Sequence, residues 1–486
     1  MVKAQDLSPD PELTAIADYV LGFEIHSEIA VKTAHLALFD FLGCALAGLD
    51  EADCRRVIRP IVPEAQVPGG ARVPGTSYEF DPATAAFAMG CMGRWLDFND
   101  SWFGTGGGHP ADMWGALLGT SDWLSRRARH QSGVPVSMAV VLDRAIKAYE
   151  ILGLHLLENV FGRFDYTAPL KAATAAAVCS LLGGGRDAIV AALSQGWIDG
   201  QPLRLFRTPY TGPRKNWASP DAAARGVWHA FKAVDGEPGY PHALSTPDWG
   251  LYDVERQGEP FRNPLPFGSH VMEHIQFKVY PAQFRAQTAL EAAIRLHPVV
   301  APRLDAVSLI EIHTHQRTLR TVDKPGPLTL PSERDHSLQY ITAIGLIHGA
   351  LDYRHYHDEV AADPRIEALI GKMRLAERPH YTAGYNDRAR RMDANAIQVH
   401  FNDGSSTDEV EILHPMGDPK RRDEALPVLT EKFRCNLRGR LPEKQEEALL
   451  ALYSDPNALS AMTVDQFMAL TVSADAPTGR EQKHGQ

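Results

Sequence analysis

Residues 95–112 combine aromatic rings with three carboxylates (Asp97, Asp100 and Asp112), the hydroxyl of Ser101 and the imidazole of His109. A glycine-rich run, Gly-Thr-Gly-Gly-Gly, separates the hydroxyl from the imidazole. One such group can remove a carbon-bound proton while another protonates a leaving oxygen, which is general acid–base catalysis. The alternative is structural, with Asp100 or Ser101 capping a helix and His109 opening a turn. Composition alone leaves both interpretations open.

A second polar cluster follows about a hundred residues later. Arg204, Arg207, Arg214 and Lys215 place four cations within twelve residues of a chain whose net charge is −11. Because arginine binds carboxylates through two parallel hydrogen bonds, this cluster would suit a polyanionic substrate. A solvated loop is the alternative.

Motifs for the common cofactors are absent from the sequence. The glycine-rich run lacks the third glycine of a dinucleotide fingerprint, and no phosphate-loop lysine, nucleophile elbow or His-Glu-x-x-His occurs. His313 and His315 would share one face of a strand, but no third metal ligand accompanies them. The five cysteines contain no Cys-x-x-Cys, which argues against zinc and iron–sulfur sites. We therefore expect neither a metal nor a cofactor.

The bulk composition is that of a globular protein with more than one domain. The 486 residues are 44% hydrophobic, and the acidic balance argues against nucleic-acid binding. The N-terminus lacks the features of a signal or transit peptide, and no apolar run is expected to be long enough to span a bilayer. These features predict a cytoplasmic protein without a membrane segment.

The elements that position these residues are mainly helical in the first half of the chain. Apolar spacing predicts helices over 10–47 and 170–183, the second rich in small residues and therefore central. Strands are predicted at 307–314 and on both sides of an Asn-Asp-Gly turn at 402–404, with a helix over 336–352.

Pro/Gly-rich stretches at 256–268 and 415–427 suggest domain boundaries. The predicted fold is mainly α: a large helical domain built from both chain ends (1–270 and 415–486, with a frayed tail at 475–486) and a smaller inserted α+β domain (271–414).

Seven stretches, taken together and in order, resemble the MmgE/PrpD family over nearly the whole chain. They are Leu96-Asp-Phe-Asn-Asp-Ser-Trp, Gly108-His-Pro, Ala148-Tyr-Glu-Ile, Asp199-Gly-Gln, Arg214-Lys-x-Trp-Ala, Phe277-Lys-Val-Tyr-Pro-Ala-x-Phe and Arg334-Asp-His-Ser-Leu-Gln-Tyr. The resemblance is strongest to members that dehydrate 2-methylcitrate. It implies a helical domain with an α+β lid, an active site in the cleft between them, and a homodimer.

The resemblance also implies which residues form the pocket. They are Asp97, Ser101, His109, Lys215, Lys278 and Tyr340. Asp165 stands where the related cis-aconitate decarboxylases have a histidine, which favours a dehydratase over a decarboxylase. Ser101 replaces the commoner threonine and keeps the hydroxyl.

The expected reaction removes water from a tricarboxylic acid without an iron–sulfur cluster. Lys215 and Lys278, with Arg204, Arg207 or Arg214, would stabilise the charge that develops on a carboxylate. His109 would be the acid or the base, with Asp97 as its orienting partner or as the base itself, and Tyr340 could protonate the leaving hydroxyl.

Three alternatives or extensions remain open at this point. The same scaffold could decarboxylate cis-aconitate or act on another tricarboxylate. Citrate, which lacks only a methyl group, would be a side substrate. A non-catalytic carboxylate-binding protein is the remote alternative, although it would have no need to keep the acid, base, hydroxyl and lysine candidates together.

Overall fold

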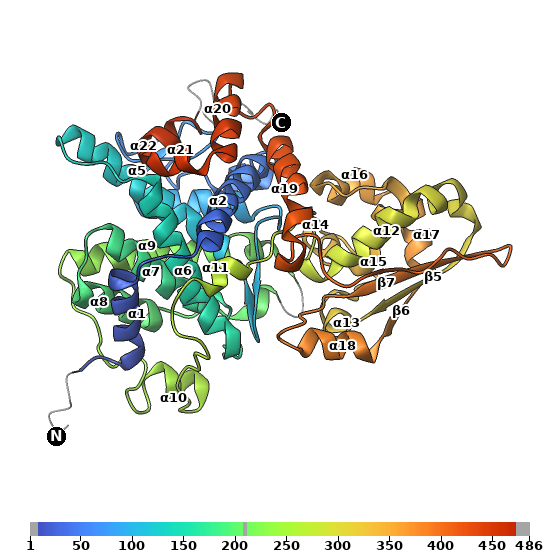
Figure 1. Cartoon of the computed structure of the whole chain (residues 1–486), viewed down its shortest axis with the longest axis horizontal. Coiled ribbons are helices and arrows are strands. Elements are labelled where there is room, and N and C mark those ends of the chain that lie inside the picture. The colour runs from blue at the N-terminus through green and yellow to red at the C-terminus, as the bar shows by residue number, and fades with distance from the viewer. Residues whose placement is uncertain (1–7, 208–210, 473–486) are drawn as a thin grey trace.

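The structure is a computed structural model that describes residues 8–207 and 211–472. Helices form the N-terminal part of the chain and return at its C-terminal end, and a four-stranded sheet with its own helices lies to one side (Figure 1). The predicted fold class, a large helical domain from both chain ends with a smaller α+β domain, is confirmed. The predicted tail at 475–486 lies outside the described residues.

The helical domain begins with two helices where the sequence predicted one continuous helix over 10–47. The first, α1, ends at Gly22, and Phe23 is extended. Ser27 then starts α2 by accepting a hydrogen bond from the amide of Ala30, as N-cap serines do. The helices before the sheet domain are α1 (Pro11–Gly22), α2 (Glu28–Gly48), α3 (Ala52–Val57), α4 (Pro82–Arg94), α5 (Trp114–His130), α6 (Met138–Glu158), α7 (Thr167–Leu181), α8 (Arg186–Ile198), α9 (Ala218–Val234), α10 (Leu251–Arg256) and α11 (His270–His274).

The small-residue helix, α7, lies at the centre of this domain. It packs against α6, α8 and α9, and its residues from Thr167 to Cys179 are buried. Alanine side chains let the neighbouring backbones approach closely, which is why a helix of this composition occupies the middle. The predicted central position is confirmed.

The C-terminal helices complete the same domain. They are α19 (Arg422–Leu437), α20 (Glu443–Ser454), α21 (Pro456–Ala461) and α22 (Val464–Ala469). Figure 1 shows them beside the N-terminal helices, and α19 packs on α2 while α22 packs on α5.

Helix α2 corrects one expectation from the sequence. Its 21 residues are long and apolar enough to cross a bilayer, contrary to the expectation that no such run exists. In the structure, 78% of its most apolar window is buried, and the helix packs against α4, α6 and α19. Helices in protein cores have this composition too.

The sheet domain carries a four-stranded sheet in the order β6-β5-β7-β8. Strands β5 and β6 are parallel, while β5–β7 and β7–β8 are antiparallel.

The strand predicted at 307–314, the hairpin around 402–404 and the helix predicted over 336–352 are confirmed, and the helix ends at His348. Strand β6 was not predicted, because it does not alternate between buried and exposed positions. The elements are α12 (Gln287–Val300), β5 (Val307–Thr314), α13 (Gln316–Val322), α14 (Pro331–Arg334), α15 (Leu338–His348), α16 (Asp358–Ala361), α17 (Pro364–Ile370), β6 (Met373–Glu377), α18 (Pro379–Asn386), β7 (Asn395–Phe401) and β8 (Val410–Ile412).

The two largest hydrophobic cores are separate, and one underlies each part. The larger core contains side chains up to Val279 and again from Ala425, whereas the smaller runs from Ala282 to Ile412. Helices α12 and α15 pack on each other in the smaller core, and α12 covers β7 and β8. The domain boundaries at 271 and 414 stay a prediction, since a change of core does not by itself define a domain.

Two short ribbons interrupt the helical domain: β1 (Ala71–Arg72) with β2 (Glu79–Phe80), and β3 (Trp102–Phe103) with β4 (Gly107–Gly108). The second ribbon contains the glycine-rich run.

Candidate active site

The glycine-rich run forms the turn of the β3–β4 ribbon, which packs tightly against α6. A Cβ at Gly104 would lie 2.2 Å from the carbonyl oxygen of Leu156. At Gly108, a Cβ would lie 2.7 Å from the ring of Tyr166. Glycine is required at both positions for close packing, and the ribbon thereby places His109 directly after β4.

A cavity of about 230 Å³ lies between this ribbon and the sheet domain. Side chains of both domains line it, and among them are the predicted residues Asp97, His109, Lys278, Arg204 and Arg207. The other lining side chains include Arg94, Phe103, Tyr166, Thr211, Gln283, Phe284, Arg285, Arg317, Arg320, Thr321, Lys324, His336 and Tyr385.

Asp97 is a buried anion on the helical side of this cavity. Its φ of 49° lies in the left-handed region, which is uncommon for a residue other than glycine. Lys278 Nζ contacts both the side chain and the backbone of Asp97: it lies 2.9 Å from Oδ1 and 2.7 Å from the backbone oxygen. Arg94 also donates to Oδ1 of Asp97. Burial opposes ionisation, but Arg94 and Lys278 outweigh it and hold the pKa of Asp97 well below its usual range.

His109 faces Asp97 with one ring nitrogen and is anchored by the other. Nδ1 lies 2.8 Å from the carbonyl oxygen of Asp100. Because a carbonyl can only accept, Nδ1 carries the proton and Nε2 of the neutral ring keeps a lone pair. Nε2 lies 3.8 Å from Oδ1 of Asp97. Burial, with Arg94 and Lys278 nearby, holds the pKa of His109 well below its usual range, so the ring is a neutral base.

Ser101 and Asp100 both lie next to Nδ1 of the His109 ring. Ser101 Oγ lies 3.3 Å from Nδ1 of His109. The Asp100 carboxyl accepts hydrogen bonds from the Tyr149 hydroxyl at 2.8 Å and the Ala111 amide at 3.1 Å. Burial raises the pKa of Asp100 to about 8. Neither side chain lines the cavity; Ser101 contacts His109 through Oγ, and Asp100 contacts it through its backbone carbonyl oxygen.

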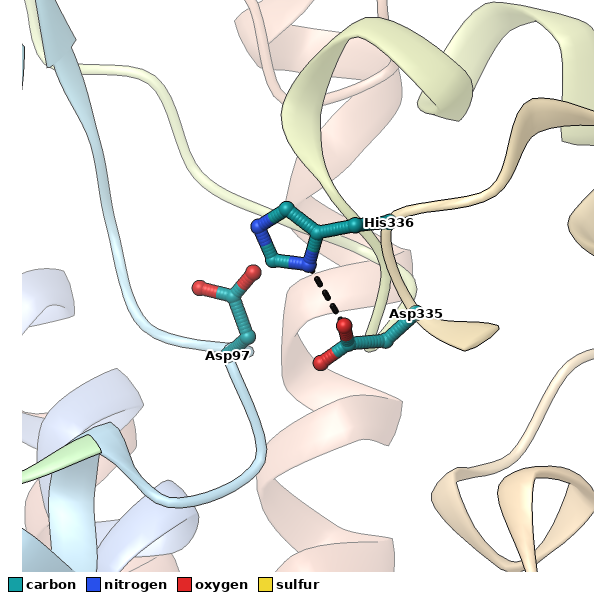
Figure 2. A group of neighbouring side chains, drawn as sticks. All are labelled: Asp97, Asp335 and His336. Carbon is teal, nitrogen blue, oxygen red and sulfur yellow. Dashed lines mark hydrogen bonds and ion pairs between the residues drawn. The ribbon is translucent and has the colours of Figure 1, made fainter. Parts of the chain in front are cut away.

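His336 lies across the cavity, at the edge of the sheet domain. Its Nδ1 donates to Oδ1 of Asp335, and Lys215 Nζ donates to Oδ2 of Asp335 over 2.6 Å. Figure 2 shows the His336 ring near the carboxylate of Asp97, with its Nδ1 turned to Asp335. Burial opposes ionisation of Asp335, but Lys215 and His336 outweigh it and lower the pKa of that carboxyl. Lys215 does not line the cavity and reaches it through Asp335 and His336.

Asp97, Asp335 and His336 offer three ligand atoms within 4.8 Å of one another, which is the spacing of a metal site (Figure 2). Both carboxylates are already paired, however, Asp335 with Lys215 and Asp97 with Lys278. A divalent ion would have to bind beside two ammonium groups in a buried place, where like charges repel strongly. The donor set therefore does not fit a resident metal.

Asp165 and Arg207 form a buried pair beside the cavity. Arg207 Nε lies 2.8 Å from Oδ2 of Asp165, and its guanidinium stacks over the ring of Tyr166. Arg207 lines the cavity and Asp165 does not. Asp165 thus orients an arginine, whereas the sequence suggested that it binds substrate itself.

Most of the remaining cations in the lining have no acidic partner. Within the described part of the chain, no ion pair is formed by Arg204, Arg285, Arg317, Arg320 or Lys324. Asp97 is the sole carboxylate among the described lining residues. This excess of positive charge in a protein of net charge −11 suits a small molecule with several carboxylates.

Two predicted site residues lie away from the cavity. The hydroxyl of Tyr340, on α15, donates to the carbonyl oxygen of His355 over 2.7 Å. Arg214 stacks on Trp217, with its guanidinium 4.0 Å from the ring centroid, and is half exposed. The structure does not bring either side chain to the other candidates.

Sequence reasoning missed several lining residues. His336 belongs to the stretch Arg334-Asp-His-Ser-Leu-Gln-Tyr, in which the family resemblance points to Tyr340 and not to the histidine. Arg317 and Arg320 follow β5 at a spacing of three, so they share one face of α13, and that basic face was a usable signal. Arg94 and Arg285 carry no comparable local signal.

Comparison with known proteins gives matches along almost the entire chain. The MmgE/PrpD N-terminal domain matches residues 14–263, and the MmgE/PrpD C-terminal domain matches residues 280–455. The 2-methylcitrate dehydratase of Cupriavidus necator is 46% identical over 472 residues, which cover 96% of this chain and 98% of the relative. That of Salmonella typhimurium is 45% identical, covering 95% and 97%. The mitochondrial 2-methylcitrate dehydratase of Yarrowia lipolytica is 41% identical, covering 96% and 91%. The chain belongs to the MmgE/PrpD family.

Proposed function

We propose that this protein is a hydro-lyase that converts 2-methylcitrate to 2-methyl-cis-aconitate and water. The observation that carries the proposal is the cavity, in which five cations without acidic partners surround a neutral imidazole base. The 2-methylcitrate dehydratases with 41–46% identity support the choice of substrate.

The reaction breaks a C–H bond beside a carboxylate and a C–O bond on the adjacent carbon. His109 Nε2 takes the carbon-bound proton, and the electron pair of that bond becomes the carbon–carbon double bond. The negative charge that develops on the neighbouring carboxylate is stabilised by fixed cations, for which Arg207 and Arg285 are positioned. Hydroxide leaves from the adjacent carbon.

Lys278 is our candidate for the group that protonates the leaving hydroxide. Burial, together with Arg94, lowers the pKa of Lys278 to about 8, although Asp97 opposes the change. An ammonium group with that pKa can release a proton near neutral pH. The hydroxide becomes water. His109 then releases its proton to the solvent and Lys278 takes up a proton from the solvent, which returns both groups to their starting protonation states. His336, on the opposite wall, is the second candidate for this role.

The methyl group of the substrate needs an apolar contact. Among the described lining residues, the purely hydrocarbon side chains are Phe103 and Phe284, whose ring centroids lie 4.8 Å apart. We assign the methyl group to this aromatic pair. Because one methyl contact is worth only about 1–3 kcal/mol, citrate should be a slower substrate and not an excluded one.

The test is to add synthetic 2-methylcitrate to enzyme that has been treated with a chelator. The product has a double bond conjugated to carboxylates, so its formation raises ultraviolet absorbance. A rise supports metal-independent dehydration. No rise, or a rise that requires added metal, would overturn the proposal. Release of carbon dioxide from cis-aconitate would instead assign the protein to the decarboxylases on this scaffold.

We further propose a cytoplasmic homodimer, as the family resemblance and the sequence composition suggest. Light scattering during size-exclusion chromatography would test the dimer, and a mass equal to one chain would overturn it.

A further inference from the structure

A second hollow adjoins the active-site cavity. Its volume is about 280 Å³, and it shares Gly104, Thr105, Arg317, Arg320 and Tyr385 with the cavity lining. Its remaining lining comes from α13, from α18 and from the segment after α18, and consists of Gln316, Thr382, Asn386, Arg388 and Arg391. The two hollows therefore share part of their walls, and we call the second the outer hollow because half of its lining lies outside the cavity lining.

Four arginines dominate this outer hollow: Arg317, Arg320, Arg388 and Arg391, which we call the outer arginine site. No described residue in its lining is acidic. Arg388 forms an ion pair with Glu158, which lies outside the hollow. Within the described chain, the other three have no ion pair, and the guanidinium of Arg391 donates a long hydrogen bond, 3.4 Å, to the carbonyl oxygen of Gly104.

The arginines of this site repel one another. Partial burial, followed by the charges of Arg285, Arg204 and Arg320, lowers the pKa of Arg317. Partial burial and Arg388 likewise lower the pKa of Arg391, although Tyr385 and Asp393 oppose the change. Arg388 is paired with Glu158, but Arg317, Arg320 and Arg391 have no ion pair within the described chain, so their mutual repulsion is a cost to the folded protein that a bound anion would relieve.

We propose that the outer arginine site is a binding site for polycarboxylates, which captures the tricarboxylate substrate before it enters the catalytic cavity. This inference rests on the proposed function for the identity of the natural ligand. Arg388 and Arg391 line the outer hollow and not the cavity, so they act on capture and not on the chemical step. A cationic funnel raises the association rate of a trianion, and dissolved salt weakens the effect.

The experiment compares the wild type with the double variant Arg388→Gln/Arg391→Gln. Initial rates with 2-methylcitrate are measured across a range of ionic strength. At low salt, kcat/KM should fall about tenfold in the variant while kcat stays unchanged, and the two enzymes should converge at high salt. The variant should also have a shallower dependence of kcat/KM on ionic strength.

Two controls separate this effect from net charge and from misfolding. Arg374→Gln removes an exposed arginine of the same domain that bonds only to backbone carbonyls, and it should leave kcat/KM unchanged. Arg391→Lys retains the charge and should stay near the wild-type value. If the double variant matches the Arg374→Gln control, or if its kcat falls together with kcat/KM, the proposal is overturned.

A binding measurement distinguishes failure of this site from failure of the proposed function. Propane-1,2,3-tricarboxylate has no hydroxyl to lose, so its Kd can be measured without turnover. The Kd should rise about tenfold at low salt in the double variant and not in Arg374→Gln. If the Kd differs in this way between the wild type and the double variant, but the wild type does not dehydrate 2-methylcitrate, only the proposed function is overturned. An unchanged Kd would overturn the outer arginine site, whatever the catalytic activity.

Discussion

His109 turns its Nε2 toward Oδ1 of Asp97, 3.8 Å away, because its Nδ1 is bound to the carbonyl oxygen of Asp100 at 2.8 Å. The backbone contact thus determines which ring nitrogen carries the proton. A carboxylate beside the free nitrogen would favour protonation, but burial of the ring, together with the charges of Arg94 and Lys278, lowers the pKa of His109 and keeps the imidazole neutral. His109 is therefore neutral, with a free lone pair on Nε2, before the substrate binds.

Replacing His109 by asparagine should abolish most of the activity without unfolding the protein. The asparagine amide can still donate to the carbonyl of Asp100, but it has no basic nitrogen. We expect kcat to fall by about 10²–10⁴-fold, with a melting temperature close to that of the wild type. Absorbance assays and thermal denaturation measure the two quantities. Near-normal turnover would remove His109 from the mechanism.

The pH dependence of kcat/KM should have a basic limb near pH 8. Lys278, whose pKa is about 8, is an ammonium below that pH and loses its proton above it, so activity declines as the pH rises. On the acid side, the lowered pKa of His109 keeps the base neutral, and the acid limb should lie below the ordinary histidine pKa of about 6.5.

The variant Lys278→Arg tests this assignment, because a guanidinium stays protonated over the whole range. Its residual activity should lack the basic limb. Asp100 also has a pKa of about 8, so Asp100→Asn serves as the control and should retain the limb. A basic limb that persists in Lys278→Arg and vanishes in Asp100→Asn would transfer the ionisation to Asp100.

Tyr340→Phe should leave catalysis almost intact. The Tyr340 hydroxyl is bound to the carbonyl of His355 and does not line the cavity, so it is not placed to protonate a leaving group. We expect less than about a threefold change in kcat, and a loss of about 0.5–1.5 kcal/mol in the free energy of unfolding from one hydrogen bond. Loss of turnover by two orders of magnitude would restore Tyr340 as the acid.

Substitution of Phe103 by alanine should reduce discrimination between 2-methylcitrate and citrate. Phe103 is half-buried and contacts Phe284, and its removal takes away part of the apolar surface for the methyl group. The ratio of the two kcat/KM values should fall about tenfold, which corresponds to one methyl contact. This ratio is independent of the fraction of folded enzyme. An unchanged ratio would place the methyl group elsewhere.

Secondary-structure elements that depend on residues close together in the sequence could be predicted from the sequence alone. The small-residue helix α7, the β7–β8 hairpin and the strand predicted at 307–314 all follow from periodicity and turn composition. The segment from Asp97 to His109 was recognised as reactive because its groups lie close together in sequence. Family resemblance added Lys278, which no local pattern would have selected.

The tertiary structure decided what these residues can do. Asp335 and His336 face Lys215 across 120 and 121 positions of sequence, and Lys278 reaches Asp97 across 181. Tyr340 and Arg214 were grouped with the site by resemblance and by charge, yet their side chains bond elsewhere. Side-chain direction, burial and the resulting protonation state depend on contacts between distant segments. Sequence by itself therefore determined the elements and the kinds of reactive groups, and only packing of the two domains decided which groups meet.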